Sequence, residues 1–130
     1  MLEKKIIITE NAPAPIGPYS QAVIANGFLF ASGQIAFDPA TGELVLSSIE
    51  AETTQVMENI KAILDEAKIN FGHIVKTSIF LSSMDLFAAV NQVYGSYFNA
   101  DFPARETVAV KGLPRNVNVE ISITAIINQS

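Results

Sequence analysis

The stretch V-N-V-E-I-S-I-T-A-I-I, residues 117–127, decides the fold class of this 130-residue chain. Within it, the apolar residues Val119, Ile121, Ile123 and Ala125 alternate with Glu120, Ser122, Thr124 and Ile126. Successive side chains of a strand point to opposite faces of a sheet, so this alternation predicts a strand with one face in a hydrophobic core. We expect the first set to face helices and the second set to lie on the other, more polar face.

The rest of the chain predicts five more strands and two helices. Asn26-Gly27 between two apolar runs is a strong hairpin signal, because both positions tolerate positive φ. One apolar stripe at helical spacing, made of Val56, Met57, Ile60, Ile63, Leu64 and Ala67, marks the longer helix. The expected strands span residues 4–9, 22–25, 28–35, 75–81, 104–110 and 117–127. The first expected helix spans residues 48–68. The second begins after capping residues at 82–85 and ends near residue 98.

The order of these elements predicts an α+β fold. Helical crossovers between strands allow neighbouring strands to run parallel, so we expect a mixed β-sheet. With two helices on one face, the sheet forms a two-layer structure. The chain has no repeat or linker, and 130 residues fit a single domain over residues 1–130.

The composition argues against several functional classes. The formal net charge of −5 and the absence of a lysine- or arginine-rich run argue against nucleic acid as a partner. A chain without cysteine has no disulfide, thiolate ligand or thiol nucleophile. The apolar run at residues 6–8 is too short for a signal peptide, and no run is long enough to span a membrane. We therefore expect a cytoplasmic protein without a membrane partner.

The more polar sheet face carries fewer charges than a free surface. We expect Arg105, Thr107 and Ala109 to share this face with Glu120 and the residues that alternate with the core. Threonine, serine and alanine with single charges suggest a half-buried surface, and we hypothesise that subunits pack these faces together in a homo-oligomer. A solvated sheet face is the alternative on the pattern alone.

Arg105 and Glu120 stand inside strongly apolar strands, where charged residues are rarely buried unless they are paired. The guanidinium fork of arginine matches a carboxylate ligand, and a glutamate in an apolar setting acquires a raised pKa that suits proton transfer. Arg105 could thus bind a carboxylate, with Glu120 as a general acid or base. A structural ion pair between neighbouring strands is the alternative, and the two residues taken alone favour it.

Other polar residues are weaker candidates. Ser32 and Gly33 stand at a strand end, where a glycine lets a ligand approach the backbone. Tyr19 follows a proline-rich loop, and Asn91 lies near the apolar stripe of the second helix. An ordinary strand end, a loop tyrosine and a solvent-facing asparagine are the structural alternatives. His73, the single histidine, lacks metal-ligand spacing, and no nucleotide-binding glycine motif occurs.

Five motifs in order give the chain a family resemblance. They are Gly17-Pro18-Tyr19-Ser20-Gln21-Ala22-Val23, Ala31-Ser32-Gly33-Gln34-Ile35, Val90-Asn91 with Tyr94 and Phe98, Pro103-Ala104-Arg105, and Leu113-Pro114 with Val119-Glu120-Ile121. Together they resemble the RidA group of the Rid (YjgF-like) family of reactive-intermediate imine deaminases. The resemblance implies a chorismate-mutase-like fold. It also implies a homotrimer with a central sheet barrel and with sites between subunits.

The resemblance also implies an activity and a division of labour. The reaction is hydrolysis of 2-imino acids, such as 2-iminobutanoate and 2-iminopropanoate, to 2-keto acids and ammonia, without cofactor or metal. Arg105 is expected to hold the substrate carboxylate, and Glu120 is expected to activate the attacking water and supply protons. Substrate-binding residues carried over in the same way are Tyr19, Ser32, Gly33, Asn91 and Thr107. The family often has cysteine where this chain has Thr107, so any thiol-dependent role is absent here.

Two other functions stay open at this point. A small-ligand-binding or regulatory protein that holds keto acids or amino acids without catalysis would use the same Arg105. Endoribonuclease activity or translation inhibition is often attached to names in this family, but the negative charge and the lack of interleaved basic and aromatic residues argue against it.

Overall fold

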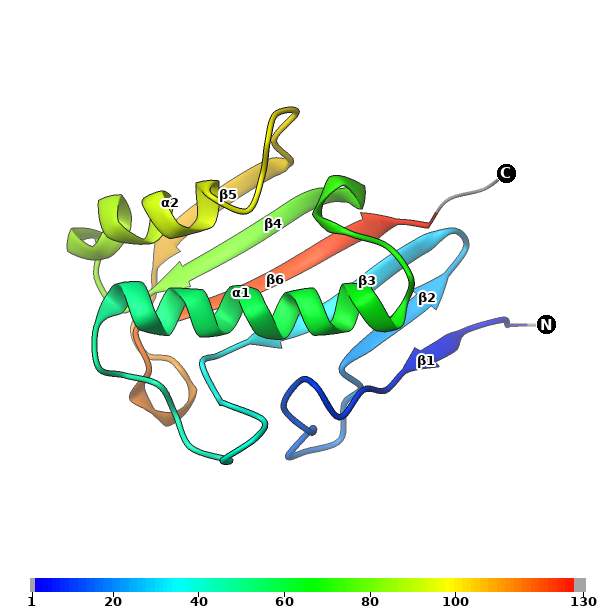
Figure 1. Ribbon diagram of the computed structural model, residues 1–130, viewed down its shortest axis with the longest axis horizontal. Coiled ribbons are helices and arrows are strands. Elements are labelled where there is room, and N and C mark those ends of the chain that lie inside the picture. The colour runs from blue at the N-terminus through cyan, green and yellow to red at the C-terminus, as the bar shows by residue number, and fades with distance from the viewer. Residues whose placement is uncertain (1, 128–130) are drawn as a thin grey trace.

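The computed structural model describes residues 2–127 and has two helices on one face of a six-stranded sheet (Figure 1). The strands are β1 (Lys5–Ile7), β2 (Ala22–Ala25), β3 (Phe28–Gln34), β4 (Ile74–Leu81), β5 (Ala104–Ala109) and β6 (Val119–Ile126), and the helices are α1 (Ile49–Glu66) and α2 (Phe87–Gly95). The strand order is β1-β2-β3-β6-β4-β5. The β4–β5 pair, which is joined through α2, is parallel, and the other neighbouring strands are antiparallel. The predicted two-layer α+β fold with a mixed sheet is confirmed.

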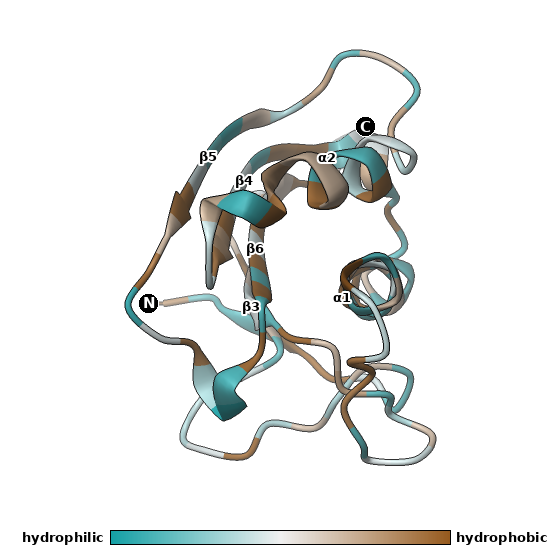
Figure 2. Ribbon diagram, turned by 90° about the vertical axis from the view of Figure 1, so that its left-hand side faces the viewer, coloured by the Kyte–Doolittle hydropathy of each residue, from teal (hydrophilic) through white to brown (hydrophobic). Residues whose placement is uncertain are grey.

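The strand β6 lies in the interior of the sheet, between β3 and β4, and its apolar face is in the core. The four residues Val119, Ile121, Ile123 and Ala125 are at most 4% exposed. Figure 2 shows α1 and α2 together on one side of the sheet. The predicted hairpin is confirmed as well, because Asn26 and Gly27 connect β2 to β3 with φ of 52° and 82°.

The helix α1 begins where its cap predicts. The Ser48 hydroxyl accepts a hydrogen bond from the Ala51 N–H at 3.0 Å, which satisfies one of the free donors of the first turn. The apolar stripe is fully buried at Val56, Ile60 and Leu64, and the helix packs against α2, β3 and β6. Within residues 2–127, no helix is long and apolar enough to cross a membrane.

The second helix is shorter than predicted. A 3-10 turn at Met84–Leu86, capped by Ser83, precedes α2, and α2 itself ends at Gly95 rather than near Phe98. After Gly95 the backbone makes tighter bonds to carbonyls three residues back, from Tyr97 N–H to Tyr94 and from Phe98 N–H to Gly95. Phe98 nevertheless packs against the core, so its apolar spacing reflects burial beyond the helix end.

The expectation that Arg105 and Glu120 share one face of the sheet is wrong. Arg105 pairs across the ladder with Thr77, which is buried, and its side chain contacts Asn91 of α2. Glu120 pairs with Phe80, three residues along β4 from Thr77, and therefore lies on the face opposite the helices. Alternation did not distinguish the two faces of β5, because charged and small or apolar residues occur in both of its sets.

We call the sheet face opposite α1 and α2 the outer face. Several large apolar side chains on it are well exposed: Ile6 (41%), Phe28 (39%), Phe30 (48%), Val108 (44%) and Ile126 (44%). Phe28 and Phe30 lie side by side, with ring centroids 6.1 Å apart. Exposed apolar side chains gathered on one face of a sheet are typical of an interaction surface.

Candidate functional site

Arg105 lies on β5 with its guanidinium group held against α2. Its Nη1 donates a hydrogen bond of 2.6 Å to Asn91 Oδ1. The guanidinium carbon lies 5.2 Å from the centroid of the Tyr94 ring and 5.6 Å from that of the Phe87 ring, within the range of cation–π attraction. Within residues 2–127, no carboxylate lies within 4 Å of Arg105. The guanidinium group is therefore oriented by neutral partners and keeps donors for an anion.

Glu120 lies on the outer face of β6, in a small cavity of about 150 Å³. Tyr19, Gly33, Phe37 and Arg115 are among the residues that line this cavity. Burial raises the pKa of the Glu120 carboxyl above its usual value. No ion pair within residues 2–127 offsets this effect. A carboxyl group whose pKa is raised holds a proton more readily than an ordinary glutamate, which suits a general acid or base.

Gly33 allows the Glu120 side chain to take its observed position, because that side chain lies directly against residue 33. The β3–β6 register shifts between Ala31 and Gln34, so an irregularity in β3 contains Gly33. A β-carbon on residue 33 would overlap Glu120 Oε2 and would lie 2.8 Å from Glu120 Cδ. The glycine thus makes room for the carboxyl group.

Gly33→Ala is expected to displace the Glu120 carboxyl while the fold survives, because the atoms that must move belong to the end of a flexible side chain. The rate of a reaction in which Glu120 exchanges protons should fall about 10-fold to 100-fold, part of the range of about 10²–10⁴ that a general acid or base contributes. Steady-state kinetics and the melting temperature of the variant check this. A variant with wild-type kcat would show that Glu120 does not need its observed position.

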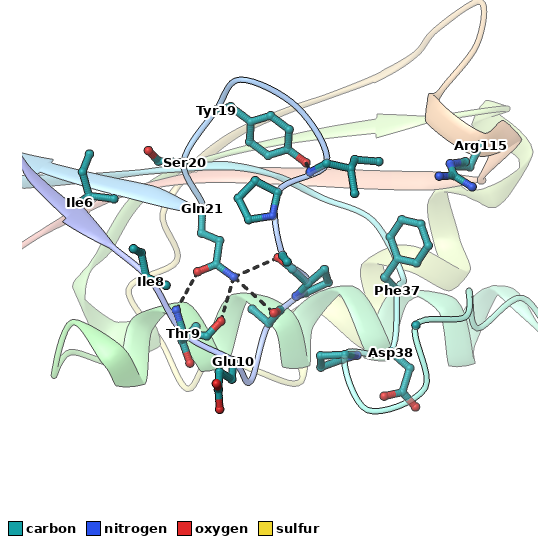
Figure 3. A pocket seen from close by; sticks show the side chains of 17 residues that line it. Ile6, Ile8, Thr9, Glu10, Tyr19, Ser20, Gln21, Phe37, Asp38 and Arg115 are labelled. Atoms are coloured by element: carbon teal, nitrogen blue, oxygen red, sulfur yellow. Dashed lines mark hydrogen bonds between the residues drawn. The ribbon is translucent and has the colours of Figure 1, made fainter.

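The loop that carries Tyr19 is held by buried Gln21. The Gln21 side-chain amide donates to the carbonyls of Thr9, Ala12 and Pro13 at 3.0, 3.2 and 2.9 Å, and its oxygen accepts from the Thr9 N–H at 2.8 Å. Figure 3 shows these bonds beneath the Tyr19 ring. The Tyr19 side chain itself is 50% exposed and borders the Glu120 cavity. The hydrogen bonds of the buried Gln21 amide thus hold the loop that places the exposed Tyr19 ring beside the cavity.

Ser32 has a structural hydrogen bond. Its hydroxyl donates to the Ser20 carbonyl at 2.6 Å, and its N–H donates to the Gln21 carbonyl at 2.9 Å. Ser32 is not among the residues that line the cavity of Glu120, although its neighbour Gly33 is. Its hydroxyl proton therefore holds the Tyr19 loop against β3, and a direct substrate contact stays a prediction.

Thr107 lies on β5 on the same face as Arg105. Its Oγ1 is buried and has no hydrogen-bond partner within residues 2–127. Thr107→Val removes this hydroxyl at nearly constant shape, so we expect the free energy of unfolding to rise by about 1 kcal/mol, since an unsatisfied buried hydroxyl costs about 1–3 kcal/mol. Denaturant titration measures the change. If the variant instead loses stability and binds its substrate more weakly, with a raised KM, the hydroxyl has a favourable partner outside the single chain.

The seven predicted site residues form two clusters on different sides of the sheet. One is the Arg105 cluster, which contains Asn91 and Thr107, under α2. The other is the Glu120 cluster on the outer face, which contains Tyr19 and Gly33, with Ser32 beside it. Because the sheet separates the clusters, Arg105 and Glu120 do not meet within one chain.

Comparison with known proteins identifies the family of the chain. The family model described as endoribonuclease L-PSP matches residues 9–127. The chain belongs to this family. The resemblance to the imine-deaminase family is thereby confirmed, because a goat (Capra hircus) relative named 2-iminobutanoate/2-iminopropanoate deaminase is 43% identical over 125 residues, which cover 96% of this chain and 91% of that protein.

Other relatives in the family carry different names. A Lactococcus lactis protein named putative regulator AldR is 51% identical over 121 residues, which cover 93% of this chain and 96% of that protein. The crystal structure of E. coli TdcF with bound serine superposes with a TM-score of 0.91 at 38% identity, covering 95% of this chain and 99% of that one. Members of this family therefore include a protein that binds a small amino acid.

Sequence reasoning missed three contributors to the site. Phe87 and Tyr94 are not among the predicted site residues, but they flank the Arg105 guanidinium group. Their spacing along the helix relative to Asn91 was the signal that could have indicated this. Arg115 borders the Glu120 cavity, and it was not singled out because an arginine after Leu113-Pro114 is unremarkable in a loop. Within residues 2–127, no cluster of three or more histidine, aspartate or glutamate side chains is arranged to hold a metal ion.

Proposed function

We propose that this protein hydrolyses reactive 2-imino acids, such as 2-iminobutanoate and 2-iminopropanoate, to 2-keto acids and ammonia. The proposal rests on the environments of two side chains, an arginine without a carboxylate neighbour within residues 2–127 and a half-buried glutamate. Arg105 is oriented by neutral partners and has no carboxylate neighbour, while burial raises the pKa of Glu120. The first group suits a substrate carboxylate, and the second suits transfer of protons to and from water. The goat deaminase in the same family supports this choice of substrate.

The proposed reaction requires an active site between two subunits. Arg105 and Glu120 lie on opposite faces of one sheet, so a cleft that contains both needs Arg105 from one copy and Glu120 from another. The strand β5 is at the edge of the sheet, where a second copy can approach Arg105. The exposed apolar side chains of the outer face support a homotrimer with packed sheets.

The reaction needs positioning and one proton relay. Arg105 binds the carboxylate and places the protonated imine carbon, which is already electrophilic, beside a water held at Glu120. The water oxygen adds to the carbon as the C=N bond becomes single, and Glu120 accepts a water proton and passes it to nitrogen. The C–N bond then breaks, its electron pair leaves with ammonia, and Glu120 accepts the hydroxyl proton as the keto group forms and passes it to the ammonia, which departs as ammonium. Positioning of this kind contributes up to about 7–11 kcal/mol.

To test the proposal, 2-iminobutanoate is generated in situ from threonine with a pyridoxal-phosphate-dependent dehydratase. Semicarbazide traps the free imine, and we expect this protein to lower the yield of trapped imine while 2-ketobutanoate and ammonia appear faster. A trapping yield that does not respond to increasing protein concentration would contradict the proposal.

Ligand binding without turnover is the second candidate. It is favoured by the serine-bound TdcF structure and by the name of the Lactococcus relative. Micromolar binding of 2-ketobutanoate by a chain that does not accelerate imine hydrolysis would select this candidate. Endoribonuclease activity, which the family description names, has no support from the charge of −5.

A further inference from the structure

Arg115 is a second arginine at the site, on the Glu120 side of the molecule. It stands in the 3-10 turn Pro114–Asn116 and borders the cavity of Glu120. It also borders a larger adjoining cavity of about 710 Å³, whose walls include Ile16, Tyr19 and Phe37. Figure 3 shows the Arg115 side chain beside Phe37, across this cavity from the Tyr19 ring. A cation thus lies where the two cavities join.

Arg115 is exposed, its guanidinium group packs on one aromatic ring, and its loop is anchored three residues later. Its guanidinium carbon lies 5.6 Å from the centroid of the Phe37 ring. The end of its loop is anchored because buried Glu52 accepts hydrogen bonds from the Asn118 N–H at 2.8 Å and from the Asn118 side chain at 2.9 Å. The Ser82 N–H donates to the Asn118 carbonyl at 3.0 Å. The arginine is therefore presented by a well-anchored loop.

The backbone at Arg115 adopts a conformation that side chains other than glycine rarely take. Arg115 and Asn116 have φ of 57° and 55°, both in the left-handed region. Strained backbone of this kind persists where the surrounding structure enforces it, and it gathers at ligand-binding sites. The residue with this backbone conformation borders both cavities.

The charge of Arg115 is not neutralised by the residues around it. Glu10 and Asp38 line the larger cavity, but neither carboxylate lies within 4 Å of the Arg115 guanidinium group, and the same holds for every other described acidic side chain. A guanidinium group stacked on an aromatic ring, with free donors in a cavity, is suited to bind a carboxylate.

We propose that Arg115 binds a second carboxylate of the substrate, so that the site accepts 2-imino dicarboxylic acids such as the imines of aspartate and glutamate. This inference rests on the proposed imine hydrolysis. With the first carboxylate on Arg105 of one copy and the imine carbon at Glu120 of another, the substrate side chain extends into the cavities that Arg115 borders. Imines of this class form wherever an acidic amino acid is oxidised at its amino group.

The test compares kcat/KM for the imine of glutamate with that for 2-iminobutanoate, the first being generated by an amino-acid oxidase. Arg115→Asn removes the charge, and asparagine tolerates the left-handed backbone. We expect the ratio of the two constants to fall at least tenfold in this variant, which corresponds to about 1.4 kcal/mol. Arg115→Lys should retain most of the ratio. Lys4→Gln, which removes an exposed cation beside the β2–β3 turn, is the matched control and should leave the ratio unchanged.

A binding measurement separates failure of this inference from failure of the proposed function. Calorimetric titration with 2-ketoglutarate and 2-ketobutanoate needs no turnover, and we expect Arg115→Asn to weaken 2-ketoglutarate selectively by about tenfold. Equal losses with both ligands, or no loss with either, would overturn the role of Arg115. Hydrolysis of 2-iminobutanoate without hydrolysis of the glutamate imine would overturn the inference alone. Absence of both activities would overturn the proposed function.

Discussion

Arg105→Ala is expected to reduce kcat/KM for 2-iminobutanoate by at least about a hundredfold while the chain still folds and assembles. A bidentate carboxylate contact consists of two charge-assisted hydrogen bonds, each contributing about 1.5–3 kcal/mol. Their loss predicts a fall in kcat/KM of roughly 10²–10⁴-fold. Steady-state kinetics with the imine generated in place measures this fall, and sedimentation of the variant reports its assembly.

The environment of Arg105 indicates that its removal spares the fold. The side chain is half-buried and lacks an ion pair within residues 2–127, and its partner Asn91 is half-buried as well. Arg105→Lys is the matched control, because lysine keeps the charge but lacks the planar fork, and we expect an intermediate rate. Full activity of the alanine variant would remove the carboxylate-binding role, and a variant that no longer assembles would show that Arg105 serves the subunit interface.

Local signals were sufficient to predict most of the fold. The alternation in residues 117–127 placed β6 in the core correctly, the Asn26-Gly27 pair defined the hairpin, and Ser48 marked the start of α1. Each of these features depends on neighbours within a few residues of the chain. The end of α2 was predicted three residues too late, because the apolar spacing continues to Phe98 after the backbone has left the helix.

The arrangement of the site depended on information that is not local. Which face of β5 carries Arg105 is set by its pairing with Thr77 and by contact with α2, and alternation within β5 is compatible with either face. The overlap that requires glycine at position 33 arises only when Glu120, 87 positions later in the chain, packs against it. The sequence therefore sufficed to name the candidate residues. Their division into two clusters is visible only in the three-dimensional structure.

Glu120→Gln is expected to retain binding of 2-keto acids and to lose hydrolysis. Glutamine has nearly the same shape but cannot accept the water proton, so kcat should fall by about 10²–10⁴-fold. The pH profile supplies a second measurement. Wild-type kcat/KM should rise through a pKa above the ordinary glutamate value, because burial raises the pKa of Glu120, and the variant should lack this limb. An unchanged kcat would contradict the acid–base role.

The same substitution is expected to stabilise the folded chain at neutral pH. Burial raises the Glu120 pKa in the folded state, so this carboxyl favours folding below its unfolded pKa of about 4.3, and that contribution is lost as the pH rises through the higher folded value. Neutral glutamine avoids the loss, so the melting temperature of the variant should exceed that of wild type at pH 7, with a gap that closes near pH 4.

Glu106→Gln is the matched control on the outer face, and its effect on stability should have the opposite sign. The Ser78 hydroxyl and Lys76 lower the pKa of Glu106, so this carboxylate favours folding above its unfolded pKa, and the contribution is lost as the pH falls. Its replacement should lower the melting temperature slightly at pH 7, because Glu106 is exposed. If both variants shift in the same direction, burial of the Glu120 carboxyl is not the cause of the gain, and the raised pKa no longer supports its role in proton transfer.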